Sequence, residues 1–200
     1  MFPLGMVLVP SMALPLHVFE PRYRALVQDC LGGDREFGVV LIERGSEVGG
    51  DDTRSDIGSV ARITEAVELP DGRWELATVG VRRLRVRTWL PDDPYPVAEI
   101  DDWPDPEPGP GCAVLAQATV SRLRLALALA AEAGDQVAPA TIELSDDPVL
   151  ASHQAAALAP IGPLDQQRLL CSSTPEARLE AVGILLTDVI AVLRLRLSEG

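Results

Sequence analysis

The stretch LPLHVFEPRYRAL, residues 14–26, decides how the first half of this chain folds. It passes from an apolar run that contains His17, through Glu20 and Pro21, into a segment rich in Arg, Tyr and apolar side chains. Proline suits the first turn of a helix, because the N–H that it lacks would have no partner there. We therefore expect a strand that leads directly into a helix, with Glu20 near the positive end of the helix dipole.

The sequence around this stretch, residues 1–100, predicts a β-rich region with a single helix, PRYRALVQDCL, closed by Gly32-Gly33. FGVVLIE (37–43) is typical of a strand buried in a sheet, whereas GSEVGGDDTRSDIG (45–58) predicts a mobile loop. Pro70-Asp71-Gly72 predicts a hairpin turn, because proline presets φ and glycine accepts the left-handed conformation.

The composition changes after residue 100, where DDWPDPEPGPG (101–111) reads as a joint. Beyond it, helical spacing of polar residues in 112–135, and capping signals before Pro148 and Pro175, predict helices. The last helix carries an apolar seam with steps of three and four: Leu179, Val182, Leu186, Val189 and Leu193. We therefore expect a β-rich domain over residues 1–104 and a helical bundle over residues 112–200, connected by residues 101–111.

The chain contains no lysine, because all 17 of its basic residues are arginine; with 30 acidic residues its net charge is −13. Without lysine there is no phosphate-loop lysine, no Schiff-base amine and no Ser-Lys catalytic dyad. The acidic excess also repels a nucleic-acid backbone on average. The composition therefore excludes several enzyme classes and argues against a nucleic-acid partner.

The three cysteines, Cys30, Cys112 and Cys171, lie far apart and form no C-x-x-C pair, which predicts reduced thiols and no zinc site. The apolar start, residues 1–16, lacks a basic segment, is interrupted by prolines and is too short to span a bilayer. We therefore expect a cytoplasmic protein with no membrane partner, no metal and no other cofactor.

An ordered set of motifs resembles the Lon N-terminal, or substrate-binding, domain. The set begins with FPLGMVLVPSMALPLHVFEPRYRALVQDCL and continues with FGVVLI, IGSVARI, LPDGRWEL, VGVRRLRV and YPVAEI. LSDDPVLAS and STPEARLEAVGILL resemble the helical continuation of small stand-alone members. The resemblance implies an α+β fold: a PUA-like β pseudo-barrel with one early helix, followed by a C-terminal α-helical bundle. One departure is Val9-Pro10-Ser11, where members commonly carry F-P-G.

The resemblance also implies a function in substrate recognition. In the full-length protease this domain precedes an ATPase and a Ser-Lys peptidase, and we expect a stand-alone member that lacks both. The leading hypothesis is a non-enzymatic module that binds peptides or proteins, as an adaptor or regulator in proteolysis. Its expected partners are unfolded or degron-bearing polypeptides, with a protease or chaperone as a further candidate.

The proline-broken apolar segment MVLVPSMALPL (6–16) is the candidate binding site. Proline confines such strands to sheet edges, and an exposed edge can accept an extended peptide by strand addition. Exposed apolar side chains would then select unfolded segments; the candidates are Met6, Leu8, Met12, Leu14, Leu16, Phe19 and Tyr23. The alternative is that these side chains fill the barrel.

Two other functions, a small hydrolase or metal site and an RNA-binding module, are supported by fewer residues. A small hydrolase or metal site would need His17 with Glu20, because His153 lies in the other predicted domain and Cys30 reads as a buried filler. A PUA-like RNA-binding module would use Arg83, Arg85 and Arg87 on one strand face. Against this, nearby glutamates are expected to neutralise the arginines across the hairpin, namely Glu65, Glu68 and Glu75, and no aromatic residues are interleaved with the arginines. A further alternative is a homo-oligomer in which copies of the chain pair through the 179–193 seam.

Overall fold

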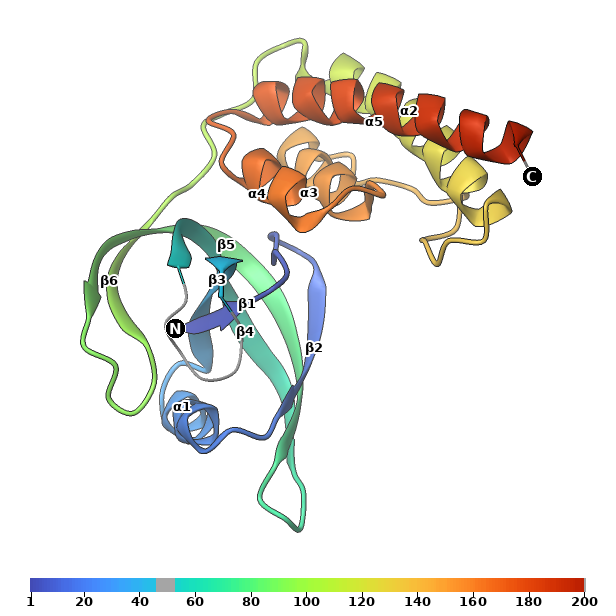
Figure 1. The fold of residues 1–200 in the computed structure, drawn as a ribbon. Helices are drawn as coiled ribbons and strands as arrows, with labels where there is room; N and C mark the ends of the chain where they lie inside the picture. The colour runs from blue at the N-terminus through green and yellow to red at the C-terminus, as the bar shows by residue number, and fades with distance from the viewer. Residues whose placement is uncertain (46–52, 200) are drawn as a thin grey trace. The chain divides into compact units, whose positions relative to one another are not determined.

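The computed structural model describes residues 1–45 and 53–199, which form two compact units, Met1–Pro104 and Asp105–Gly200 (Figure 1). Within the described residues, the first unit contains one helix and a mixed sheet of six strands, and the second contains four helices. The expected α+β class, with a β-rich part before a helical part, is therefore confirmed.

The first unit is built on one curved sheet. Its strands are β1 (Phe2–Leu4), β2 (Ala13–Val18), β3 (Glu36–Arg44), β4 (Thr53–Glu68), β5 (Trp74–Leu90) and β6 (Val97–Asp102). The strand order is β1-β3-β4-β5-β2, with β6 also paired to β5, and only the β1–β3 pair is parallel. The strands β1 and β2 therefore stand at the two ends of the sheet path.

The long β4–β5 hairpin turns at Pro70-Asp71-Gly72 as predicted, with Gly72 at a φ of +77°. The predicted loop over residues 45–58 was wrong for 53–58, which belong to β4, whereas residues 46–52 lie outside the described residues. Gly58 explains this difference, since a Cβ there would lie 2.1 Å from the carbonyl oxygen of Val39. A residue that reads as a loop former is here the one that lets β3 and β4 approach.

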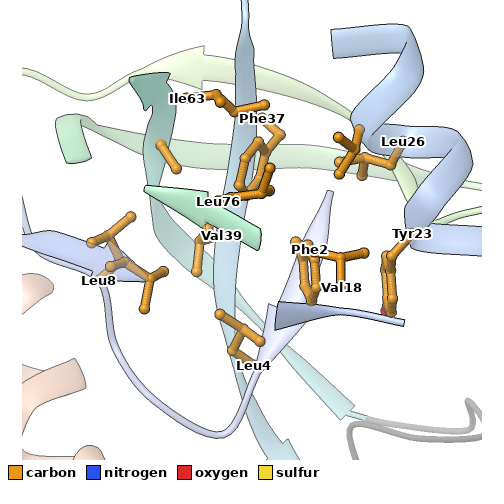
Figure 2. Packing of buried hydrophobic residues seen from close by; sticks show 13 residues of the cluster. Phe2, Leu4, Leu8, Val18, Tyr23, Leu26, Phe37, Val39, Ile63 and Leu76 are labelled. Carbon is orange, nitrogen blue, oxygen red and sulfur yellow. The ribbon is translucent and has the colours of Figure 1, made fainter. Parts of the chain in front are cut away.

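The core of the first unit lies between the sheet and α1 (Pro21–Gly32), and Figure 2 shows its packing. The rings of Phe2 and Tyr23 stack at a centroid distance of 4.1 Å, which joins β1 to the helix. Pro21 is the first residue of α1, and Glu20 before it has extended backbone. The predicted passage from strand to helix is therefore confirmed, and it places α1 against the sheet.

The second unit consists of α2 (Cys112–Glu132), α3 (Pro148–Leu158), α4 (Pro163–Leu170) and α5 (Pro175–Ser198). Asp147 caps α3 by accepting from the N–H groups of Val149 and Leu150, and Thr174 caps α5 by accepting from that of Ala177. Both predicted helix starts are confirmed. The short helix α4 was not predicted, although Gly162-Pro163 is a recognisable start signal.

Candidate functional site

Strand β2 is an edge strand with hydrogen-bonding groups on its outer side. It pairs antiparallel with β5, and the N–H of Gly80 donates to the carbonyl of Met12 at 2.9 Å. Because hydrogen-bonded pairs alternate along an antiparallel ladder, the even-numbered residues of β2 face β5. The backbone groups of Ala13, Pro15 and His17 therefore face away from it, and Pro15 stands where a missing N–H costs the sheet nothing.

A pocket of about 130 Å³ lies where β1, β2 and the start of α1 meet. Most of its lining is apolar: Phe2, Leu4, Leu16, His17, Val18, Phe19, Glu20 and Tyr23. Leu16 and His17 also line a more open groove of about 460 Å³ that extends over β5 and β4 to Glu65, Val67 and Glu75. An extended segment along β2 would thus meet backbone groups, an apolar pocket and an acidic rim together.

The seven residues predicted to bind peptides lie at different depths. Leu8, Leu14 and Tyr23 belong to the buried core, and Met12 and Leu16 pack partly buried against it. Met6 and Phe19 are the exposed members, at 48% and 53%. The structure brings Leu16, Phe19 and Tyr23 together in the pocket, and peptide binding by any of the seven stays a prediction.

Sequence reasoning missed Leu4 and Val67 as candidate contacts. Val67 is a large apolar residue that is 54% exposed on β4, in register with Glu75, which is itself opposite His17 on β2. Nothing in the sequence around Val67 indicated which strand would lie beside it. The pairing of β4, β5 and β2 is what places it near the candidate edge.

The structure gives no support to a catalytic or metal site at His17. The Glu20 carboxylate accepts from Nε of Arg22 at 3.0 Å, whereas Nε2 of His17 lies 3.3 Å from Nη1 of Arg73. Among residues 1–45 and 53–199, no three side chains of His, Cys, Asp or Glu gather where they could hold a metal ion. The two residues of the proposed dyad therefore face different arginines.

Cys30 is half-buried on α1, and its thiol donates to the carbonyl of Glu36 at 3.3 Å. Burial raises the pKa of this thiol to about 11. The side chain is therefore protonated near neutral pH, and because the thiolate is the reactive form, Cys30 is a poor nucleophile.

His153 and Asp105 form a buried pair in the second unit, with Nε2 of His153 2.8 Å from Oδ2 of Asp105. Arg178 donates to Oδ1 of the same carboxylate and to Oγ of Ser152, each at 2.7 Å. Burial alone would raise the pKa of Asp105, but the hydrogen bond with His153 and the charge of Arg178 bring that pKa down to about 2.

This cluster contains Ser, His and Asp but lacks the geometry of a catalytic triad. The hydroxyl of Ser152 donates to the carbonyl of Val149, and the histidine nitrogen that a serine would need faces the carboxylate. All four side chains are also withdrawn from solvent. The network therefore ties the start of the unit, at Asp105, to α3 and α5.

The arginines of β5 are paired within the first unit. Arg87 forms an ion pair with Asp101, Arg82 with Glu36 and Asp102, and Arg83 and Arg85 stack on the Trp103 ring at 4.1 and 4.6 Å. The expected partners Glu65, Glu68 and Glu75 were wrong, because they lie at the other end of the hairpin. Arg83 is moreover buried, so the stripe does not form one exposed basic face.

One helix in the described part of the chain, α2, is long and apolar enough by length and composition alone to cross a membrane. A helix that packs inside a water-soluble bundle passes the same criterion, and α2 packs against α3 and α5. This feature is weak evidence for a membrane span.

Comparison with known proteins gives a consistent result. The family model for the ATP-dependent protease La (LON) substrate-binding domain matches residues 1–188. The crystal structure of a Lon N-terminal domain protein from Xanthomonas campestris is 30% identical, with a TM-score of 0.63 over 90% of this chain and 92% of that one. The N-terminal domain of Mycobacterium avium complex Lon protease, 17% identical, shares the fold with a TM-score of 0.64 over 94% and 96% of the two chains.

Among complete proteases, Lon protease 2 of Herpetosiphon aurantiacus is 27% identical over 192 residues. That match covers 94% of this chain but 23% of the protease, and for Lon protease 2 of Sorangium cellulosum the corresponding shares are 50% and 13%. The chain thus spans less than a quarter of the length of these relatives.

Proposed function

This chain belongs to the Lon substrate-binding domain family, and we propose that it captures unfolded or degron-bearing polypeptides at the β2 edge. The family model describes a substrate-binding domain, which supports a role in recognition and not in catalysis. The module acts as an adaptor or regulator in cytoplasmic proteolysis, with chemistry left to a separate protease.

The observation that carries this proposal is the outer side of β2 next to an apolar pocket. The outward backbone groups of Ala13, Pro15 and His17 can pair with an incoming strand, which gives affinity that does not depend on sequence. Leu16 and Phe19 at the pocket then accept apolar side chains that a folded protein keeps inside. Unfolded segments offer both features at once, whereas folded surfaces do not.

The negative charge of the groove restricts which polypeptide segments should bind best. Glu65 of β4 and Glu75 of β5 both line the open groove, and the chain as a whole carries a net charge of −13. An acidic rim attracts basic side chains and repels acidic ones, mainly through the association rate. Segments that combine apolar and basic residues should bind best.

A peptide array and a titration with a reduced, unfolded model protein test this function. We expect saturable binding, and about a tenfold loss of affinity for Phe19→Ala, the size of loss that about 1.4 kcal/mol at an interface anchor produces. Ile100→Ala is the matched control, because Ile100 is also an exposed apolar residue of the first unit but lies on β6. Absence of saturable binding by folded, monodisperse protein would overturn the proposal.

A further inference from the structure

The outer face of α5 is apolar where solvent should favour polar residues. The predicted 179–193 seam is used inside the unit, since Leu179, Val182, Leu186 and Leu193 are buried in the bundle core. On the opposite face, large apolar side chains are exposed: Ile184 at 66%, Val192 at 65% and Leu195 at 60%. Large apolar side chains gathered on the exposed face of a helix indicate a surface that a partner covers.

The neighbouring helix α2 extends this apolar surface. Val114 is 70% exposed on it, and the two helices border a groove of about 430 Å³. Leu115, Ala118, Gly183 and Ile184 line this groove together with the charged residues Arg122 and Glu180. Contiguous exposed apolar surface of this kind marks an interaction site. The charges on α5 indicate which partner would cover it.

One stripe of α5 is symmetric about Thr187 in both size and charge. Glu180 and Arg194 lie seven residues before and after Thr187, and Gly183 and Ala191 lie four residues before and after it. These spacings put all five residues on one stripe of the helix. Small residues therefore occupy its middle, and opposite charges lie at its two ends, about 21 Å apart along the axis at 1.5 Å per residue.

We propose that this stripe is the contact between two copies of the chain, with α5 of one antiparallel to α5 of the other and a two-fold axis at Thr187. That axis brings Glu180 of each copy opposite Arg194 of the other, so both ion pairs form by one operation. Within residues 1–45 and 53–199 neither Glu180 nor Arg194 has an ion-pair partner, whereas Arg196 on the same helix pairs with Asp135.

Two further features suit this contact. The Thr187 hydroxyl already donates to the carbonyl of Gly183 at 2.9 Å, so covering it leaves no unpaired group. Glu180 and Arg194 cancel on a chain whose net charge is −13, so this stripe lets two acidic copies meet without repulsion there. An anionic membrane would instead be repelled by the chain as a whole.

Sedimentation velocity of the full chain, from micromolar to near-millimolar concentration, tests the proposal. We expect a reversible shift to twice the monomer mass. Glu180→Arg and Arg194→Glu, each of which sets like charges opposite each other twice, should weaken the dimer about tenfold or more, because about 1.4 kcal/mol corresponds to a factor of ten. The double variant Glu180→Arg with Arg194→Glu should restore it.

The control is Glu132→Arg, which changes the net charge as Glu180→Arg does but lies at the end of α2 and is not among the residues that line the groove. It should leave the dimer within about twofold, a change below 0.5 kcal/mol. Helical circular dichroism should be unchanged in all variants, since every substituted side chain is exposed. The proposal would be overturned if the protein stayed monomeric at all concentrations, or if the control weakened the dimer as much as the single variants do. Flotation with neutral phosphatidylcholine vesicles in place of dimerisation would also overturn it.

Discussion

Each unit of this chain contains a cluster of arginine and carboxylate side chains, and the two clusters differ in depth. In the β-rich unit, Glu36 joins Arg62 and Arg82 at the surface, where both guanidinium groups remain in solvent. In the helical unit, Asp105 and Arg178 form an ion pair out of solvent. A surface pair contributes about 0–1 kcal/mol, whereas breaking a buried pair from one side costs about 3–5 kcal/mol. Ion pairs between arginine and a carboxylate therefore contribute little to the stability of the first unit and much to that of the second.

Replacing Arg178 should have the largest effect on stability. Arg178→Met leaves the Asp105 carboxylate buried without its cation, and we expect the free energy of unfolding of the helical unit to fall by about 3–5 kcal/mol. Urea denaturation followed by helical circular dichroism measures this. Arg82→Met is the matched control in the β-rich unit, with an expected loss below about 1 kcal/mol. Equal losses in the two variants would show that the contrast between the units is false.

Leu14 and Phe19 were both predicted to bind peptides, but only Leu14 should contribute strongly to the stability of the fold. Leu14→Ala removes a buried side chain, and we expect the free energy of unfolding to fall by about 2–5 kcal/mol. Phe19→Ala should change it by less than about 0.5 kcal/mol, because the ring is exposed. Thermal unfolding of the two variants makes the comparison, and a large loss for Phe19→Ala would place its ring among the structural residues.

The different burial of Leu14 and Phe19 shows which part of the site the sequence could predict. The strand-to-helix passage at Glu20-Pro21 and the caps at Asp147 and Thr174 follow from local backbone chemistry, and the sequence predicted all of them. Burial along residues 6–16 could not be predicted in the same way. Prolines and an irregular backbone interrupt the alternation there, so no period assigns Leu8 to the core and Met6 to solvent.

The partners of the β5 arginines show a second limit. The β4–β5 ladder shifts register between Val60 and Ala61 and again between Ile63 and Glu65. The two shifts cancel, so Ser59 lies opposite Arg83, as counting from the Pro70-Asp71-Gly72 turn gives. The sequence did not reveal that β6 would pair with the far half of β5. The acids that pair with Arg82 and Arg87 come mainly from β6, a strand distant in sequence from the expected glutamates.

Acid should weaken the helical unit through the buried carboxylate of Asp105. The pKa of Asp105 is lowered from 3.8 to about 2 in the folded chain, so its contribution is complete above pH 4 and is lost as the pH falls through 2. At about 1.4 kcal/mol per pKa unit, this contribution is about 2 kcal/mol. Unfolding measured between pH 5 and pH 2 should show the loss in the wild type. Asp105→Asn should lack this pH dependence, and a variant that keeps it would contradict the assignment to Asp105.

The smallest expected effect concerns Ser11, a non-glycine residue whose backbone has a positive φ. Its φ of 68° lies in the left-handed region that costs a non-glycine residue about 1–2 kcal/mol. Ser11→Gly relieves that strain but adds entropy to the unfolded chain, for a net gain of roughly 0.5 kcal/mol. Ser11→Ala is the control, which keeps the strain and should give no gain in melting temperature.

The proposed function requires that an unfolded polypeptide adds a strand to the outer side of β2. Residue-resolved amide hydrogen exchange, with and without a saturating unfolded model protein, tests it most directly. We predict that the amides of Ala13 and His17 become protected on binding, while those of the outer strand β6 stay unchanged. Protection confined to the helical unit, or saturable binding with no change at Ala13 and His17, would contradict the account.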